Sequence, residues 1–408
     1  CLSIVDGGLL GVAEGDLCGL GGGAVRGLAT EWGAGKPQGV RVLEGFKFVE
    51  RWFRANGGFS RLSREEVDGV VGGLDLGKLR WKDLKETVRG SGMVDDSRMV
   101  GLLIDKVDES KLHEVSYATL GKLAASFGSS GKGEGQFNSV TKIAVHGQGS
   151  AQRVAAVDAT QNRVLVFNVE SGECVASVGS EGNGPGQIQK PGDVAFNQRG
   201  EMYVSDAKLC RISVFDLSGA FVRSFGAEGS GNGQFHGPRG LAFTPGGELV
   251  VADWSNHRVM VLREDGTFVR AIGSFGKGQG KFSCPEGVAV GADGRICVAD
   301  LDNHRVQVFD SRGVFERVIG KKGKGPGHFQ MPYSVAVGGM GEILVSDMQR
   351  ADIQVFKEDG EFLGKLGEHA EGGTGASYTC PLGFAVDSSG GRVFVGCNLR
   401  KKVFMFTQ

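Results

Sequence analysis

The sequence predicts an all-β protein, a closed ring of six four-stranded blades (a β-propeller), preceded by a small all-α region. Two observations support this prediction. From about residue 122 to the end of the chain, a unit of roughly 47 residues recurs six times. Each unit contains four short apolar segments separated by glycine-rich turns. A period of this length with four strands per unit is typical of propeller blades.

Each unit carries four strand patterns, here lettered a to d, which are clearest at residues 278–320. Strand a follows a Phe-x-x-Pro step at residues 288–290, and strand b ends in aspartate at residues 296–300. Strand c alternates apolar residues from 305 to 309, and strand d runs from 315 to a glycine at 320. Short alternating strands between glycine-rich turns indicate β-structure.

The aspartate that ends strand b marks the register of the repeat. It recurs every 47 or 48 residues, and the sixth unit has Cys397 in its place. The sixth unit stops after strand c, and residues 122–127 have the pattern of a lone strand d. We expect this segment to pair with the last blade, because closing the ring removes exposed sheet edges. The propeller is therefore assigned to residues 122–408.

Three segments recur in the units: Gly-x-Gly-x-Gly-Gln-Phe-x-x-Pro-x-Gly-Val-Ala, Val-Ala-Asp and Asn-x-Arg-Val-x-Val-Phe. This pattern resembles the NHL repeat, and the third and fourth units match it best. The resemblance implies a six-bladed propeller that serves as a binding domain, as in TRIM-NHL ubiquitin ligases and RNA regulators. NHL propellers are also similar to propeller enzymes such as the peptide-amidating lyases.

Residues 1–110 have helical rather than strand periodicity. Apolar residues recur at helical spacing from 42 to 53, and Ser63-Arg-Glu-Glu66 has the form of a capping box. Residues 46–52, 79–93 and 95–103 resemble the BACK domain, which follows BTB in cullin adaptors. The resemblance implies a BTB domain upstream and cullin as a partner. Because the chain begins at Cys1 without Met, we expect it to be a fragment. Residues 111–121 are assigned as a linker.

The composition excludes several classes of function. The formal net charge of −1 excludes a strongly basic nucleic-acid domain. The eight cysteines form no CxxC and no zinc spacing, which excludes a RING finger or B-box and favours a reduced, cytoplasmic setting. No apolar run of 18 residues is present, so no membrane partner is expected.

Residues that recur at one register are expected to serve the fold. The strand-b aspartates should accept hydrogen bonds from the b–c turn and from the arginine that opens strand c. His257 and His304 share one register, so a structural role is preferred over a metal site. No nucleophile elbow, HExxH motif or phosphate loop occurs, and no catalytic residue, cofactor or metal is expected. The residues assigned to the fold are Asp206, Asp253, Asp300, Asp347, Arg258 and Arg305.

Equivalent positions that differ between units are free to serve function. The d–a and b–c loops open on one face of a propeller, and large side chains there are typical of binding hot spots. Together with nearby positive charge, they suit an acidic peptide or a single-stranded RNA. The residues predicted to bind a partner are Arg239, Trp254, Leu301, Tyr333, Met348, Lys321, Lys322, Lys324, Arg400 and Lys401.

Three functions follow as expectations. The first is a non-catalytic propeller that binds a protein, as the substrate receptor of a ubiquitin ligase. The second is an RNA-binding regulator that uses the same face. The third is a propeller hydrolase or lyase.

Overall fold

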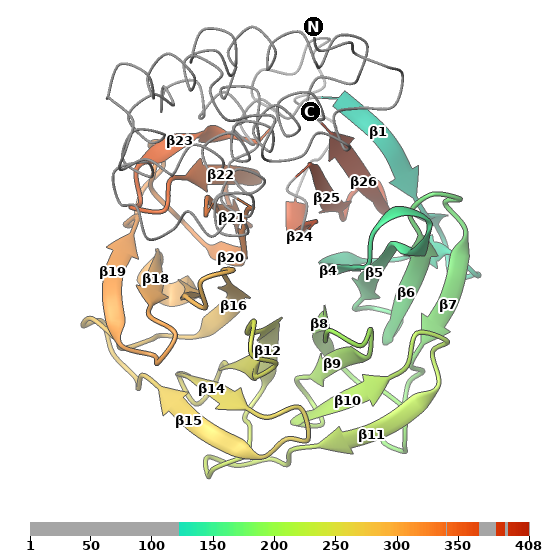
Figure 1. The fold of residues 1–408 in the computed structure, drawn as a ribbon, viewed down its shortest axis with the longest axis horizontal. Helices are drawn as coiled ribbons and strands as arrows, with labels where there is room; N and C mark the ends of the chain where they lie inside the picture. Colours follow the sequence, from blue (N-terminus) through green and yellow to red (C-terminus); the bar gives the residue numbers. More distant parts are fainter. Residues whose placement is uncertain (1–121, 340, 367–380, 388–390, 408) are drawn as a thin grey trace, which may run out of the picture. The chain divides into compact units, whose positions relative to one another are not determined.

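The computed structural model describes residues 122–339, 341–366, 381–387 and 391–407. The predicted helical region and linker, residues 1–121, lie outside this part. The described residues form a six-bladed β-propeller, which confirms the predicted fold class (Figure 1). No helix within the described residues is long and apolar enough to cross a membrane.

Each blade is a four-stranded antiparallel sheet with strand a innermost (Figure 1). The first three blades consist of β4 (Val140–His146), β5 (Arg153–Asp158), β6 (Arg163–Asn168) and β7 (Cys174–Val178); β8 (Pro191–Phe196), β9 (Met202–Asp206), β10 (Arg211–Phe215) and β11 (Phe221–Phe225); and β12 (Pro238–Phe243), β13 (Leu249–Asp253), β14 (Arg258–Leu262) and β15 (Phe268–Ile272).

The other three blades complete the ring. They consist of β16 (Pro285–Val290), β17 (Ile296–Asp300), β18 (Arg305–Phe309) and β19 (Phe315–Ile319); β20 (Pro332–Val337), β21 (Ile343–Asp347), β22 (Asp352–Phe356) and β23 (Phe362–Lys365); and β24 (Pro381–Val386), β25 (Arg392–Cys397), β26 (Lys402–Thr407) and β1 (Lys122–Phe127). The short strands β2 (Ser129–Ser130) and β3 (Gln136–Phe137) lie in the loop that enters the first blade.

The last blade joins two distant parts of the chain. β1 pairs antiparallel with β26, with Lys122 opposite Thr407 and Phe127 opposite Val403. Phe127 is buried against Phe167 of the first blade and Phe394 of its own blade. The ring is therefore closed by hydrogen bonds within one sheet, and the buried aromatic ring adds apolar contacts on both sides.

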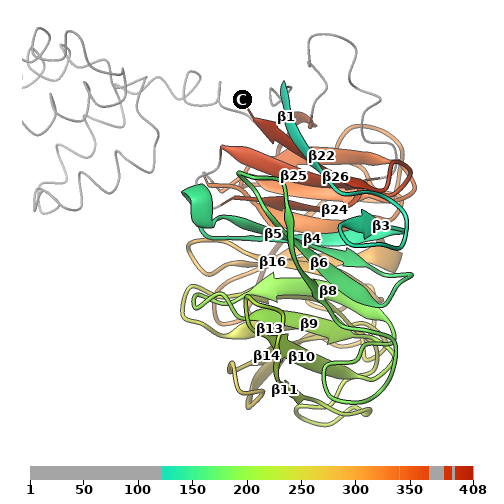
Figure 2. The ribbon, with the colours of Figure 1, turned by 90° about the vertical axis from the view of Figure 1, so that its right-hand side faces the viewer.

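The hydrophobic core lies between neighbouring blades, whose sheets stand face against face (Figure 2). One core cluster joins Val250 and Val261 of the third blade to Val288, Val298 and Phe309 of the fourth. Strands β13 and β17 are buried at every residue, whereas the outer strand β15 alternates between exposed and buried side chains. Burying an aliphatic side chain contributes about 1.5–3 kcal/mol, so blade-on-blade packing stabilises the whole ring.

A left-handed residue precedes strand c in each blade. It adopts φ between 51° and 57° at Asn162, Cys210, His257, His304, Ala351 and Lys401. This backbone conformation turns the chain sharply from strand b into strand c. Since His257 and His304 both occupy this turn position, their common register has a structural cause.

We predict that Ala351→Gly stabilises the propeller by roughly 0.5–1 kcal/mol. Alanine is strained at the positive φ of this turn, and glycine removes the strain at some cost in chain entropy. Urea unfolding measures the difference. The matched control is Ala271→Gly, at an exposed position in the extended strand β15, where glycine should destabilise the protein. Destabilisation by both variants would contradict the role assigned to the left-handed turn.

Candidate functional site

The b–c turns and the d–a loops lie at one end of the blades, and together they form what we call the loop face. A buried carboxylate connects the two. Asp253, at the end of β13, accepts hydrogen bonds from His236 N (2.7 Å), Asn256 Nδ2 (2.8 Å) and Arg258 Nε (2.9 Å). The side chain of Asp253 is fully buried. One aspartate thus fixes the turn that follows its own strand and the loop that precedes the blade.

The fourth blade repeats this network. Asp300 accepts hydrogen bonds from Ser283 N (2.7 Å), Asn303 Nδ2 (2.8 Å) and Arg305 Nε (2.8 Å). Burial raises the pKa of Asp300, while these three donors favour its ionised form. The sequence pattern indicates the aspartate–arginine pair but not the bond to the backbone of the preceding loop.

The arginine that opens strand c also holds the d–a loop. Arg258 donates to the carbonyl oxygens of Ser230 (2.8 Å), Gly231 (2.9 Å) and Gln234 (2.9 Å). Arg305 does the same to Gly278 and Lys281. The glycine-rich loops are therefore tied down at several carbonyl groups by a guanidinium.

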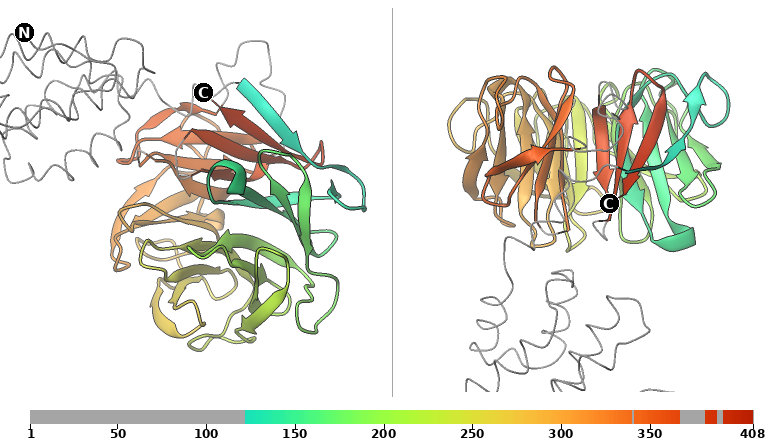
Figure 3. Two further views of the ribbon diagram at one scale, coloured as in Figure 1. Left: turned by 45° about the vertical axis from the view of Figure 1, so that its right-hand side comes forward. Right: turned by 90° about the horizontal axis from the view of Figure 1, so that it is seen from above.

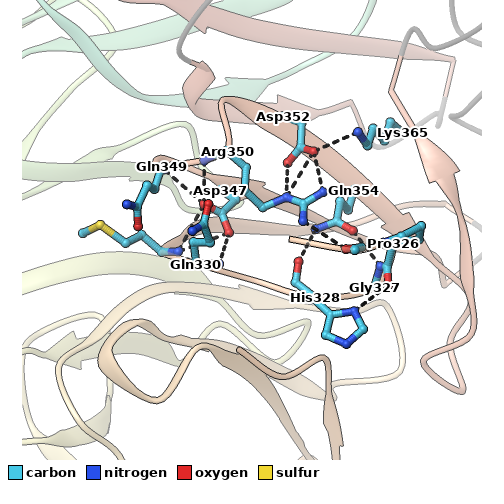
Figure 4. A network of polar contacts seen from close by, with 12 residues as sticks. Pro326, Gly327, His328, Gln330, Asp347, Gln349, Arg350, Asp352, Gln354 and Lys365 are labelled. Atoms are coloured by element: carbon cyan, nitrogen blue, oxygen red, sulfur yellow. Dashed lines mark hydrogen bonds and ion pairs between the residues drawn. The ribbon is translucent and has the colours of Figure 1, made fainter. Parts of the chain in front are cut away.

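The fifth blade reaches the same result with different residues (Figure 4). Its strand c begins with Asp352, whereas strand c of the third and fourth blades begins with arginine. Arg350 forms an ion pair with Asp352 at 3.0 Å. Arg350 also donates to Gly325 O of the d–a loop at 3.0 Å. Asp347 accepts from Gln330 N and Met331 N instead of a guanidinium. The loop is held although the arginine has moved by two positions.

A second group of polar residues lies on the inner strands, and we call it the axial cluster: Lys142, Asp193, Arg239, Glu286 and Tyr333. These residues come from β4, β8, β12, β16 and β20, the innermost strands of five consecutive blades, which surround the ring axis (Figure 1; the ring is seen edge-on in Figure 3). Lys142, Asp193 and Glu286 are all at least nine-tenths buried. Charged residues at such positions need partners.

Lys142 spans from the first blade to the fifth. Its ammonium donates to Tyr333 O (3.1 Å) and Ser334 Oγ (3.3 Å) and lies 4.2 Å from the centre of the Tyr333 ring. Burial lowers the pKa of the Lys142 amine, although the negative charges of Asp193 and Glu286 oppose this effect. The amine thus connects two blades that are not neighbours.

Asp193 is held mainly by backbone groups. Its carboxylate accepts hydrogen bonds from Val194 N (2.8 Å) and Leu241 N (3.1 Å), the second of which belongs to the next blade. Burial raises the pKa of Asp193 to about 6, against the attraction of Lys142 and these two donors.

Arg239 connects the axial cluster to the loop face. Its Nε lies 3.9 Å from Glu286 Oε2, and its guanidinium lies 5.7 Å from the centre of the Trp254 ring. Burial raises the pKa of Tyr333, and the negative charge of Glu286 raises it further. Trp254, the residue that follows Asp253 on the loop face, therefore contacts a guanidinium that is ion-paired with the buried Glu286.

Glycine explains why the inner strands approach so closely. A Cβ atom at Gly383 would lie 2.4 Å from Lys142 Cα, and one at Gly287 would lie 2.6 Å from Tyr333 O. The corresponding position is a charged residue only in the first two blades, as Lys142 and Asp193. Two opposite charges on neighbouring inner strands, at a position that is glycine or serine in the other blades, are the sequence signal for the axial cluster.

The structure separates the predicted binding residues into two groups. Lys321, Lys322, Lys324 and Arg400 are exposed, whereas the large side chains and Lys401 are partly buried. Arg239 and Tyr333 belong to the axial cluster rather than standing free at the loop face, and the Arg239 side chain is only 20% exposed. The partly buried residues are Arg239, Trp254, Leu301, Tyr333, Met348 and Lys401.

The two histidines of the b–c turns connect neighbouring blades. His257 Nδ1 accepts a hydrogen bond from Cys284 N (3.1 Å), and His304 Nδ1 lies 2.6 Å from Gln330 O. Within the described ranges, no group of three or more His, Cys, Asp or Glu side chains is placed to hold a metal ion.

The NHL repeat family matches residues 235–262 and 282–309, which span most of the third and fourth blades. The chain therefore carries NHL repeats on a six-bladed propeller. No curated protein is significantly similar in sequence.

Several solved structures share the propeller architecture. A gluconolactonase from Xanthomonas campestris has a TM-score of 0.50 at 15% sequence identity, over 67% of this chain and 86% of that chain. A virginiamycin B lyase from Staphylococcus aureus has a TM-score of 0.47 at 12% identity, over 66% of this chain and 96% of that chain. A chain of a nidogen–laminin complex has a TM-score of 0.46 at 19% identity, over 56% of this chain and 80% of that chain. At these identities the likeness concerns the fold alone.

We predict that Asp193→Asn changes the pH dependence of stability. Because the pKa of Asp193 is raised in the folded protein, the folded state binds a proton more tightly than the unfolded state between about pH 4 and pH 6. The contribution of this group to stability therefore falls as the pH rises through that window. The asparagine variant loses this contribution, on the order of 1–3 kcal/mol.

Urea unfolding at pH 4.5, 5.5 and 6.5 tests this prediction. The free energy of unfolding of the wild type minus that of the variant should decrease as the pH rises. The control is Asp265→Asn at an exposed turn, where the hydrogen bond from Thr267 N lowers the pKa of Asp265. The control difference should stay nearly constant over this range, since the stabilisation that comes with a lowered pKa is lost only below the ordinary pKa of 3.8. A flat difference for Asp193→Asn would contradict the assignment.

Proposed function

We propose that the propeller is a protein-recognition module that binds its partner through the loop face. The proposal rests on one observation: similar polar contacts recur from blade to blade, whereas the side chains that they place on the loop face differ. The residue after the strand-b aspartate is Trp254, Leu301 and Met348 in three consecutive blades, whereas the first two blades have alanine there. Large side chains that differ between otherwise equivalent positions are suited to selecting one partner.

The contact between Trp254 and Arg239 also favours the loop face as the binding surface. The Trp254 ring lies 5.7 Å from the Arg239 guanidinium, which faces the buried carboxylate of Glu286 at 3.9 Å. A side chain held in place before binding loses little conformational entropy when a partner arrives. Trp254 is therefore the best candidate for an energetic centre of the interface.

A finer proposal concerns the pathway. If residues 1–110 form a BACK-like helical domain, the propeller would present a substrate to a cullin ubiquitin ligase. Support for this comes from the resemblance in residues 46–103. Co-purification with a cullin tests it, using the protein with any BTB domain that precedes this sequence. Failure of that protein to bind cullin would contradict the ligase role and leave protein recognition untouched.

RNA binding is the second candidate function, favoured by the exposed lysines at Lys321, Lys322 and Lys324. Binding through phosphate contacts would weaken steeply with salt. An affinity for single-stranded RNA that stays constant between 50 and 200 mM salt would contradict it.

The hydrolase or lyase alternative rests on the displaced pKa values of Lys142 and Asp193, since such shifts are common at active sites. Both groups are buried, and the Lys142 amine is bonded to Tyr333 O and Ser334 Oγ. Their contacts join blades, which favours a role in ring closure over chemistry on a substrate.

We predict that Trp254→Ala weakens peptide binding at least tenfold, as expected for a hot-spot aromatic. The binders are 12-residue peptides selected by phage display on the 408-residue chain, and affinities are measured by fluorescence anisotropy. The matched controls are Val222→Ala and Val269→Ala, whose side chains are 46% and 36% exposed on the outer strands. They should leave the affinity unchanged. Selection of no peptide, or equal losses in the controls, would contradict recognition by the loop face.

A further inference from the structure

The d–a loops share one backbone frame, so their side chains can be compared position by position. A glycine N–H donates to the carbonyl oxygen of a buried phenylalanine in four of them: Gly131 to Phe137, Gly229 to Phe235, Gly276 to Phe282 and Gly323 to Phe329, at 2.9–3.0 Å. In each of these loops, and in the loop that enters the second blade, one residue forms a parallel β-bridge with a buried apolar residue. This residue is Ser130, Glu181, Glu228, Phe275 or Lys322. The backbone contacts recur in these loops, whereas the charge and the apolar character of this residue differ.

The d–a loops differ in charge. The loops that enter the second and third blades, residues 179–190 and 226–237, carry Glu181 and Glu228, and the first of these loops ends in the exposed Lys190. The loops that enter the fourth and fifth blades, residues 273–284 and 320–331, contain no acidic residue. They carry five lysines instead: Lys277, Lys281, Lys321, Lys322 and Lys324. We call these two loops the basic loops.

The lysines of the basic loops are available to a partner. All five are exposed, and none forms an ion pair or a side-chain hydrogen bond with any residue the structure describes. Phe275, two residues before Lys277 in the first of these loops, is 68% exposed, and its ring centre is 4.8 Å from that of His257. Among the phenylalanines that the structure describes, the others are buried or partly buried.

A second observation singles out the same two loops. Gln307 accepts from Gly280 N (3.0 Å) and donates to Lys281 O (2.8 Å). Gln354 accepts from Gly327 N (2.9 Å) and donates to His328 O (2.9 Å), as Figure 4 shows. Both glutamines are fully buried at the third position of strand c. That position is Leu165, Ser213 and Met260 in the first three blades. The two buried glutamines therefore hold the backbone of the basic loops in place, which lowers the conformational entropy lost on binding.

We propose that the basic loops form the docking site for an acidic protein segment that also carries a large apolar side chain. Carboxylates of the segment pair with the lysines, and its apolar side chain packs on Phe275. Glu181 and Glu228, on the loops of the second and third blades, repel such a segment, which favours the fourth and fifth blades. This inference rests on the proposed function and names its partner class. A peptide is favoured over RNA because successive bases need several aromatic platforms, and Phe275 is the one exposed Phe, Tyr or Trp in the described ranges.

The test uses peptides selected on the full chain from a random 12-residue display library. We expect them to be enriched in Asp and Glu and to contain an aromatic or large aliphatic residue. The double variant K322E/K324E should weaken their binding about tenfold, since it replaces two attractions with two repulsions. Phe275→Ala should weaken binding by a similar factor. Raising the salt from 50 to 300 mM should weaken it further.

The matched control reverses charge on the loops that enter the second and third blades. E181K/E228K alters two loops of equal length and should leave the affinity unchanged or increase it. Circular dichroism and thermal unfolding establish that each variant is folded. A twelve-residue oligouridine serves as the RNA probe.

The outcomes separate this inference from the proposed function. Selected peptides that depend on Trp254 but are neutral or basic, or that bind K322E/K324E as tightly as the wild type, would overturn the acidic docking site and leave protein recognition standing. Oligouridine that binds more tightly than any peptide would overturn it in favour of RNA. Selection of no peptide at all would overturn both.

Discussion

The loop face depends on a buried carboxylate at the end of strand b in five of the six blades. Burying a carboxylate costs several kcal/mol unless the charge is compensated. Asp253 is compensated by three donors, from the preceding loop, the b–c turn and strand c. Removing any one donor would leave a buried charge short of partners. The aspartate therefore specifies the positions of two loops at once, and the side chains on those loops can vary without disturbing the ring.

The repeat pattern predicts most of the architecture because the same interactions recur at the same offsets. The four strands, the six blades and the Asp–Arg pair of blades three and four can all be recognised from spacing. Blade five shows where spacing fails. Its strand c opens with Asp352, and the stabilising arginine is Arg350, which sits two positions earlier. Because the arginine that holds the loop lies at a different position of this unit, the expected position does not reveal the contact.

The contacts of the axial cluster could not be predicted by comparing one unit with the next. Its contacts join residues that are far apart in sequence, such as Lys142 and Tyr333, and only ring closure brings them together. The sequence predicts Arg239 and Tyr333 as large side chains that bind a partner. The structure shows that burial and ion pairing at the axis account for much of their character. The helical region predicted at residues 1–110 lies outside the described residues and stays a prediction.

The pairing of β1 with β26 has a consequence for biosynthesis. During translation β1 emerges from the ribosome before any other strand of the propeller, yet its partner is the last strand to be made. Until then, β1 and the adjacent face of the first blade expose an unpaired edge and apolar surface, which are features that promote aggregation. Chaperone occupancy of the nascent chain should therefore persist until the final strand is released.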